Sequence, residues 1–256
     1  MAEEIKNEET VEEVAQTEEV AEDAAKDAEK TAKKAGKKKK WPIVVGVVAV
    51  VLVAAGAGFW VWHEQPSFCN AICHTPMDAY YETYADGSTD KYGNELDEAG
   101  RNSMMAYLHV QTDGTTCMDC HVPSIGEQIT EGMNWVTGNY EIEGTNALGQ
   151  AVMPERALSD LTEARGVPED EFCLNSGCHT NDDGSVMTRD DLIEATADLT
   201  DSPRNPHLAQ HGERACSDCH KAHSQSVNYC TSCHNDAPVP EGWLTMAEAK
   251  KLHVVE

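Results

Sequence analysis

Residues 215–234 read ACSDCHKAHSQSVNYCTSCH, and this stretch contains one short pattern twice. In each copy two cysteines are separated by two residues, and a histidine follows the second cysteine directly. The pattern recurs earlier in the chain with two, three or four residues between the cysteines. All ten cysteines belong to its five copies, which are Cys69–Cys73–His74, Cys117–Cys120–His121, Cys173–Cys178–His179, Cys216–Cys219–His220 and Cys230–Cys233–His234.

The repeat indicates covalently attached haem. Cys-x-x-Cys-His is the attachment motif of c-type haem, in which two thioethers hold the porphyrin and the histidine reaches the iron. A zinc ribbon built from the last two cysteine pairs is one alternative, and disulfide bonds are another. Neither requires a histidine after every second cysteine. Spacers of three or four residues bulge the loop but keep the histidine in place, so we predict five haem c groups.

The composition after residue 63 supports a cofactor-filled domain. This part has 33 Asp and Glu against 10 Lys and Arg, a net charge of −23, and the whole chain has only three Phe. A domain so poor in large apolar side chains needs another source of stability, which haem groups supply. Its acidity excludes nucleic acid as a partner, and it fits either a solvated surface or steering toward a basic protein.

No alternation of apolar and polar residues is sustained, so strands should not dominate. We expect a mostly α and irregular multihaem cytochrome c, with one transmembrane helix and a haem-packed extracytoplasmic domain. Helices are predicted at residues 159–166 and 188–199, the second with Thr188 as its N-cap.

Residues 43–62 are twenty residues without a charge, enough to span a bilayer core of about 30 Å. Trp41, Trp60 and Trp62 stand where aromatic belts form, and the lysines at 37–40 place the N-terminal end in the cytoplasm. We therefore predict a single-pass protein of the cell membrane. A signal peptide cut at residues 55–57 is the alternative, but the apolar run is long for one.

The predicted organisation has four parts. Residues 1–40 form a cytoplasmic, mostly disordered tail, residues 41–62 the anchor, residues 63–245 the pentahaem domain and residues 246–256 a C-terminal tail. Ala54 and Gly58 in the anchor have a small-xxx-small spacing, which would allow a homo-oligomer.

Six of the 11 histidines lie outside the motifs. His63 touches the membrane boundary and His253 lies near the C-terminus, which leaves four histidines for the four motifs after the first. This match predicts bis-histidine ligation of haems two to five, and hence electron transfer rather than substrate binding. The sequence does not pair these ligands with motifs; they are His109, His207, His211 and His223.

The first motif is different because Met77 follows His74 by only three residues. The connecting chain is too short for both side chains to bind opposite faces of one iron, so either His74 or Met77 is the ligand. The other face is then open or weakly bound, which suits a lipid-soluble quinol as electron donor. Quinol oxidation also releases protons, for which Asp78, Lys91 and Asp97 are the candidate acceptors.

From its basic N-terminus through HVQTDGTTCMDCHVP at residues 109–123, the chain resembles the NapC/NirT/NrfH family of membrane-anchored multihaem quinol dehydrogenases. The resemblance implies that Met77 ligates the first haem and that quinol binds beside it. That family usually has four haems and a two-residue spacer in the first motif, unlike this chain. Residues 205–235 are more similar to the tetrahaem domains of flavocytochrome c reductases.

The sequence therefore predicts a membrane cytochrome that takes electrons from menaquinol or another quinol. Its last motifs would pass them to an extracytoplasmic reductase, either a flavoprotein or a haem enzyme. One alternative is a terminal reductase for nitrite or a similar oxyanion, although all five motifs end in histidine. Another is a passive carrier fed by a different membrane complex, with His63 or His253 closing the first haem.

Overall fold

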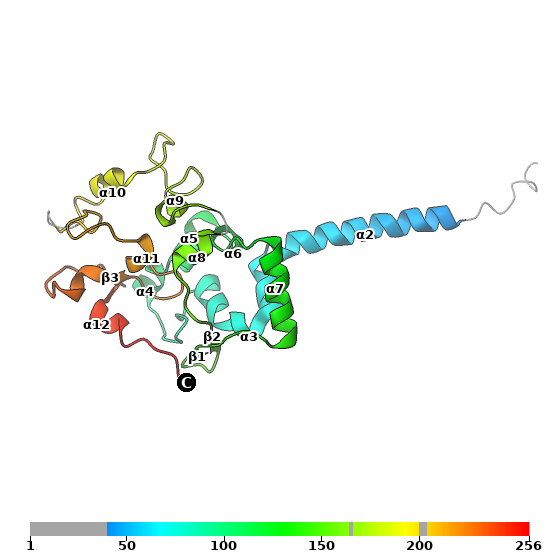
Figure 1. Cartoon of the computed structure of the whole chain (residues 1–256), viewed down its shortest axis with the longest axis horizontal. Coiled ribbons are helices and arrows are strands. Elements are labelled where there is room, and N and C mark those ends of the chain that lie inside the picture. The colour runs from blue at the N-terminus through cyan, green and yellow to red at the C-terminus, as the bar shows by residue number, and fades with distance from the viewer. Residues whose placement is uncertain (1–39, 164–165, 200–203, 256) are drawn as a thin grey trace, which may run out of the picture. The chain divides into compact units, whose positions relative to one another are not determined.

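The computed structural model describes residues 40–163, 166–199 and 204–255, apart from the side chains of Cys73, His74, Thr75, Glu163 and Glu169. The tail predicted at residues 1–40 lies outside the described residues up to position 39. The chain divides into two units, one ending at Gly58 and the other running from Phe59 to Glu256 (Figure 1).

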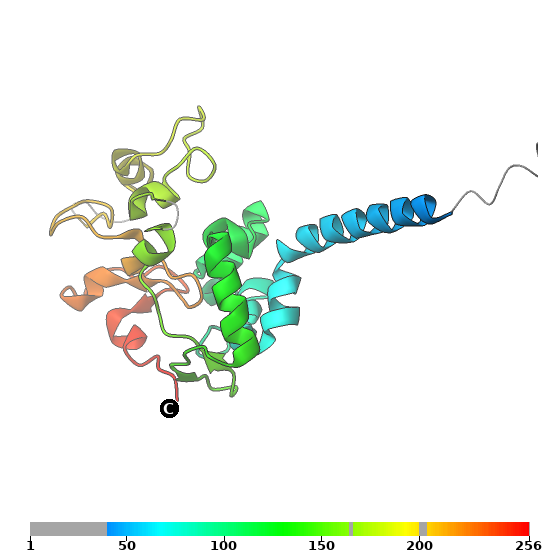
Figure 2. The same ribbon diagram turned by 45° about the vertical axis from the view of Figure 1, so that its right-hand side comes forward.

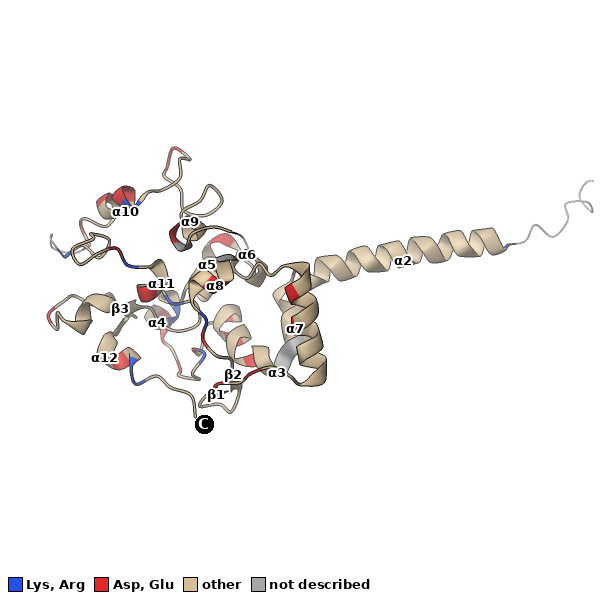
Figure 3. Cartoon of the chain, in the orientation of Figure 1, with Lys and Arg blue, Asp and Glu red and all other residues tan. Residues whose placement is uncertain are grey.

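Helix α2, Trp41–His63, contains the apolar run. Its 23 residues give a length of about 35 Å at 1.5 Å per residue. Within the described part of the chain, it is the one helix long and apolar enough to cross a membrane. Figure 3 shows no charged residue along it. The side chains from Trp41 to Trp62 are exposed, which suits a lipid environment better than water.

The second unit consists of helices joined by loops, with two pairs of two-residue strands among its described residues (Figures 1 and 2). This confirms the predicted mostly α and irregular fold. The helices are α3 Pro66–Ala85, α4 Glu98–Asn102, α5 Met105–Asp113, α6 Cys117–Cys120, α7 Ile125–Thr137, α8 Leu158–Glu163, α9 Glu169–Cys173, α10 Arg189–Ala195, α11 Cys216–Cys219, the 3-10 turn η1 Tyr229–Ser232 and α12 Met246–Ala249. The strands are β1 Gly144–Thr145 with β2 Ala151–Val152, antiparallel, and β3 Val227–Asn228 with β4 Leu244–Thr245, parallel.

Both helices predicted in the middle of the chain are present as α8 and α10. The hydroxyl of Thr188 accepts a hydrogen bond from the backbone N–H of Asp191, and the Asp191 carboxylate accepts one from the backbone N–H of Thr188. This reciprocal cap starts α10. The helix ends at Ala195 rather than at residue 199, because Thr196 leaves helical geometry and binds Asn205 and His207.

The apolar core of the second unit is small. Among the described residues, the buried apolar side chains are Ala79, Met104, Ala151, Val152 and Val227. A unit of this size normally buries a far larger apolar core. The interior is therefore incomplete without additional apolar groups, as the sequence predicted.

Polar contacts bring distant segments of this unit together. Ser103 Oγ donates to the Gly242 carbonyl at 2.9 Å, and the fully buried Ser226 donates to the Ser103 carbonyl at 2.5 Å. The Tyr80 hydroxyl bonds to both backbone groups of Met153, which joins α3 to the segment after β2. The two serine bonds hold the segment between α4 and α5 against the C-terminal part of the chain.

The last residues pack onto the domain, although a separate tail was expected from residue 246. Thr245 caps α12 by accepting from the backbone of Glu248. Val255 then exchanges backbone hydrogen bonds of 2.7 and 2.9 Å with Thr145. Gly144 permits this approach, since a Cβ there would lie 2.7 Å from the Val255 carbonyl oxygen.

Candidate haem sites

Each motif with a two-residue spacer forms a single tight turn. The backbone N–H of the histidine donates to the carbonyl of the first cysteine, four residues earlier, which is the spacing of an α-helical bond. One turn therefore organises both sulfurs and the imidazole. The three bonds are His121 to Cys117 at 2.8 Å, His220 to Cys216 at 2.9 Å and His234 to Cys230 at 2.9 Å.

The two motifs with longer spacers also keep their cysteines and histidine close together, but with different backbone conformations. In the third motif the His179 N–H still donates to the Cys173 carbonyl, at 3.3 Å, although two more residues intervene. Asn175 shapes this bulge, because its side-chain oxygen accepts from the Gly177 N–H at 2.8 Å. In the first motif α3 is continuous, so Cys69 and Cys73 are about one helical turn apart along it.

Four pairs of histidine rings lie close together, each pair separated by a short gap. Each pair joins one motif histidine to one of the four histidines outside the motifs that the sequence singled out. The ring centres are 6.1 Å apart for His179 and His109, 6.2 Å for His121 and His223, 6.5 Å for His220 and His207, and 6.1 Å for His234 and His211.

This spacing fits one metal ion between two imidazoles. Metal–imidazole bonds are about 2 Å long, so rings on opposite faces of one iron have centres about 6 Å apart once about 1 Å per ring is added. Three pairs have nearly parallel ring planes, at 10°, 22° and 27°, and the pair of His109 and His179 is nearly perpendicular, at 87°. All of these angles are compatible with axial ligands, because each ring need only contain the axis through the iron.

Burial favours the neutral imidazole, the form that binds a metal, at His121, His179, His207, His220 and His223. It lowers the pKa of His223 to about 3, with a smaller contribution from His121. It also lowers the pKa of His220 to about 4, and more moderately that of His121 and His179. The residues present therefore fit haem c, with two sulfurs, a motif histidine and a facing histidine at each of four sites.

Neighbouring motifs lie close to one another. Burial raises the pKa of Cys117 to about 11, and the nearby Cys69 adds to the effect. A hydrogen bond from Cys173 lowers the pKa of Cys216. The first motif therefore adjoins the second, and the third adjoins the fourth.

Two further links join the fourth motif to the fifth and to the second. Burial raises the pKa of Cys219, and Cys230 in the fifth motif adds to the effect. His223, which faces the second motif, follows His220 of the fourth motif by only three residues. The second motif therefore lies near the first and the fourth, and the fourth lies near the third and the fifth.

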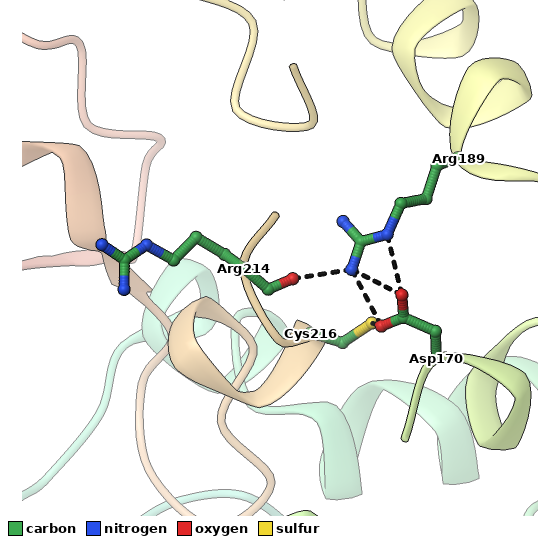
Figure 4. A network of polar contacts seen from close by, with 4 residues as sticks. All are labelled: Asp170, Arg189, Arg214 and Cys216. Atoms are coloured by element: carbon green, nitrogen blue, oxygen red, sulfur yellow. Dashed lines mark hydrogen bonds and ion pairs between the residues drawn. The ribbon is translucent and has the colours of Figure 1, made fainter. Parts of the chain in front are cut away.

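A salt bridge ties the third and fourth motifs together (Figure 4). Arg189 donates two hydrogen bonds of 2.8 Å to the Asp170 carboxylate on α9, and a third of 2.7 Å to the Arg214 carbonyl. The Cys216 sulfur lies 3.5 Å from the same carboxylate. The bidentate geometry makes this pair stronger than an ordinary surface ion pair.

The residues predicted to serve a quinol site lie in different places. Met77 and Asp78 are half-buried on α3, close in sequence to the first motif. Lys91 is buried with its Nζ 3.4 Å from Glu155, and its backbone N–H donates to the His223 carbonyl, so it lies beside the second site. Asp97 caps α4 by accepting from the Gly100 N–H at 2.8 Å.

The two remaining histidines are held apart from the four pairs. The His63 ring packs against Phe59, Trp60 and Phe68, and its buried Nδ1 has no hydrogen-bond partner. His253 is exposed and bonds to the Lys251 carbonyl at 2.6 Å. Sequence reasoning missed Thr83 and Thr196, which bond to His223 and His207, because no motif marks a lone threonine.

The fold and the paired sites define a multihaem c-type cytochrome. Residues 159–235, which contain the last three motifs, match the cytochrome c3 family. The cytochrome c-type protein Cgr1 of Eggerthella lenta is 59% identical over 218 residues, which cover 84% of this chain and 91% of that protein. The chain therefore belongs to this family of multihaem c-type cytochromes, with covalently bound haem c. No solved structure matches it.

The Arg189 salt bridge should contribute measurably to stability. Replacing Arg189 with Met should lower the free energy of unfolding by about 1–3 kcal/mol, because Asp170 loses a charge-assisted partner. Arg204→Met is the matched control, because the Arg204–Asp236 side chains are 46% and 61% exposed, against 23% and 35% for Arg189 and Asp170. Denaturant titration followed by circular dichroism would measure both. Equal losses in the two variants would contradict the assignment.

The fifth site offers the most accessible test of histidine pairing, since both of its rings are exposed. His211→Ala should convert one low-spin iron to high spin, because a five-coordinate site remains. Electron paramagnetic resonance of the oxidised protein would show the loss of low-spin and the gain of high-spin signal. His253→Ala is the control and should change nothing. An unchanged low-spin intensity in His211→Ala would refute this pair.

Proposed function

We propose that this chain is a membrane-anchored pentahaem cytochrome that oxidises a quinol, with menaquinol the expected one. It would pass the electrons to a separate extracytoplasmic reductase. Haem c supplies reversible one-electron redox chemistry at each motif. The histidine pairing carries this proposal, because motifs two to five use each of the four spare histidines once. The first motif, six residues after α2, is left without any of them.

The environment of the first motif supports electron entry from lipid. Trp60 and Trp62 are exposed at the end of α2, where aromatic residues favour the interface of a bilayer. With the lysines at 37–40 on the cytoplasmic side, the motifs lie outside the membrane. Of the three proton acceptors predicted from sequence, Asp78 is the one on α3 beside Met77, so it is our candidate to accept a quinol proton. The resemblance to the NapC/NirT/NrfH family points the same way.

The far end of the relay supports electron exit to a protein partner. His211 and His234 are both exposed, as is Cys233. Figure 3 shows Asp and Glu on α9 and α10, and the whole chain carries a formal net charge of −26. Such a surface steers a basic partner toward the exposed site.

A passive carrier is the second candidate, favoured by His63. The centre of its ring lies 4.9 Å from that of Phe68, the residue directly before Cys69. Its buried Nδ1 has no hydrogen-bond partner. If His63 closes the first site, quinol has no open iron to reduce. In that case another membrane complex supplies the electrons.

The direct test uses the purified full-length protein in vesicles that contain menaquinol. Wild type should be reduced by the quinol, as followed by its visible haem absorption. Met77→Leu should slow the initial reduction by about tenfold, because it removes a ligand or packing group at the entry site. Met133→Leu, at an exposed methionine on α7, is the matched control and should match wild type.

Dithionite should reduce all three proteins fully, which verifies that their haems are competent. Full reduction by dithionite with none by menaquinol or its analogues would rule out quinol oxidation. His63→Ala then separates the candidates, since a new high-spin signal in this variant would support the passive carrier.

A further inference from the structure

Three of the four histidines that face a motif are also held at their second ring nitrogen. His223 Nδ1 lies 2.8 Å from the Thr83 hydroxyl, and His207 Nδ1 lies 3.0 Å from the Thr196 hydroxyl. His109 Nδ1 lies 2.7 Å from the Met105 carbonyl. In each case Nε2 is the nitrogen left for a metal.

The direction of these bonds follows from the partners. The Thr83 hydroxyl donates its single proton to the Tyr80 carbonyl at 2.6 Å, so toward His223 it can only accept. The Thr196 hydroxyl donates to the Leu192 carbonyl at 2.5 Å and likewise accepts from His207. Both imidazoles therefore carry their proton on Nδ1 and keep a lone pair on Nε2.

Both threonines stand in firmly packed surroundings. Thr83 is 0% exposed on α3, and the neighbouring Tyr80 ring meets His223 edge-on at 5.2 Å between centres. Asn205, 5% exposed, donates to Thr196 Oγ1 and accepts from the His207 backbone N–H at 2.9 Å. The same hydroxyl arrangement thus occurs twice, on unrelated segments.

We propose that Thr83 and Thr196 are positioning residues that fix the tautomers of His223 and His207, respectively. Each threonine thereby lowers the redox potential of the iron that its histidine would ligate. A hydrogen bond from Nδ1–H to an oxygen makes the imidazole a stronger electron donor, which favours the oxidised metal. The proposal rests on the histidine pairing in the proposed function, and it is independent of quinol oxidation.

Spectroelectrochemical titration with small-molecule mediators, without quinol, tests it on the full-length cytochrome. Thr83→Val keeps the shape of the side chain and removes its hydroxyl. It should raise the midpoint potential of one haem, with a change of about two- to tenfold in its oxidised-to-reduced ratio at fixed potential. Thr83→Ser should restore the wild-type value. Thr196→Val and Thr196→Ser should do the same for a different haem.

Thr137→Val is the matched control, because its hydroxyl bonds to the Met133 carbonyl four residues earlier but touches no histidine. It should titrate as wild type. The proposal fails if both valine variants titrate as wild type, if serine does not restore the potential, or if all haems shift together. Should Thr83→Val fail to mature, the Thr196 series decides. A normal titration without reduction by menaquinol would refute only the proposed function.

Discussion

The separation of about 6 Å between facing imidazoles is the constraint on which the second unit depends. A metal held between two rings fixes both of them, and two of the four pairs here join segments far apart in the chain. His121 faces His223, and His109 faces His179. These cross-connections explain how a unit with so few buried apolar side chains keeps one arrangement. The haem groups replace the missing core and at the same time provide the redox chemistry.

Backbone and side-chain chemistry around the pairs serves the same constraint. In the motif turns, one backbone hydrogen bond to the first cysteine orients the motif histidine. The facing histidines are directed by tertiary contacts, such as Thr83 on α3 and Met105 at the start of α5. The Arg189 salt bridge holds the third and fourth motifs together. An electron relay needs this rigidity, because electrons pass between neighbouring haem sites. The path of the electrons therefore depends on which sites stay next to one another.

The haem-attachment motifs, the number of spare histidines and the fold class were predictable from sequence, because they follow from local covalent chemistry. The partner of each histidine was not, since it depends on how loops meet in space: His223 faces the second motif although it follows the fourth. The positions of Lys91 and Asp97 were also not predictable. Lys91 lies beside His223, and Asp97 caps the N-terminus of α4. The packed C-terminus was missed because a two-residue bridge at Val255 leaves no periodic signal.

The most direct test of the histidine pairing is low-temperature electron paramagnetic resonance of the fully oxidised wild-type protein. Parallel imidazoles raise the same iron d orbital, whereas perpendicular ones raise two orbitals equally, so the two arrangements give distinct low-spin signals. The structure predicts three signals of the parallel type and one strongly anisotropic signal from the His109–His179 pair. More than one high-spin iron per protein, or the absence of the strongly anisotropic signal, would contradict it.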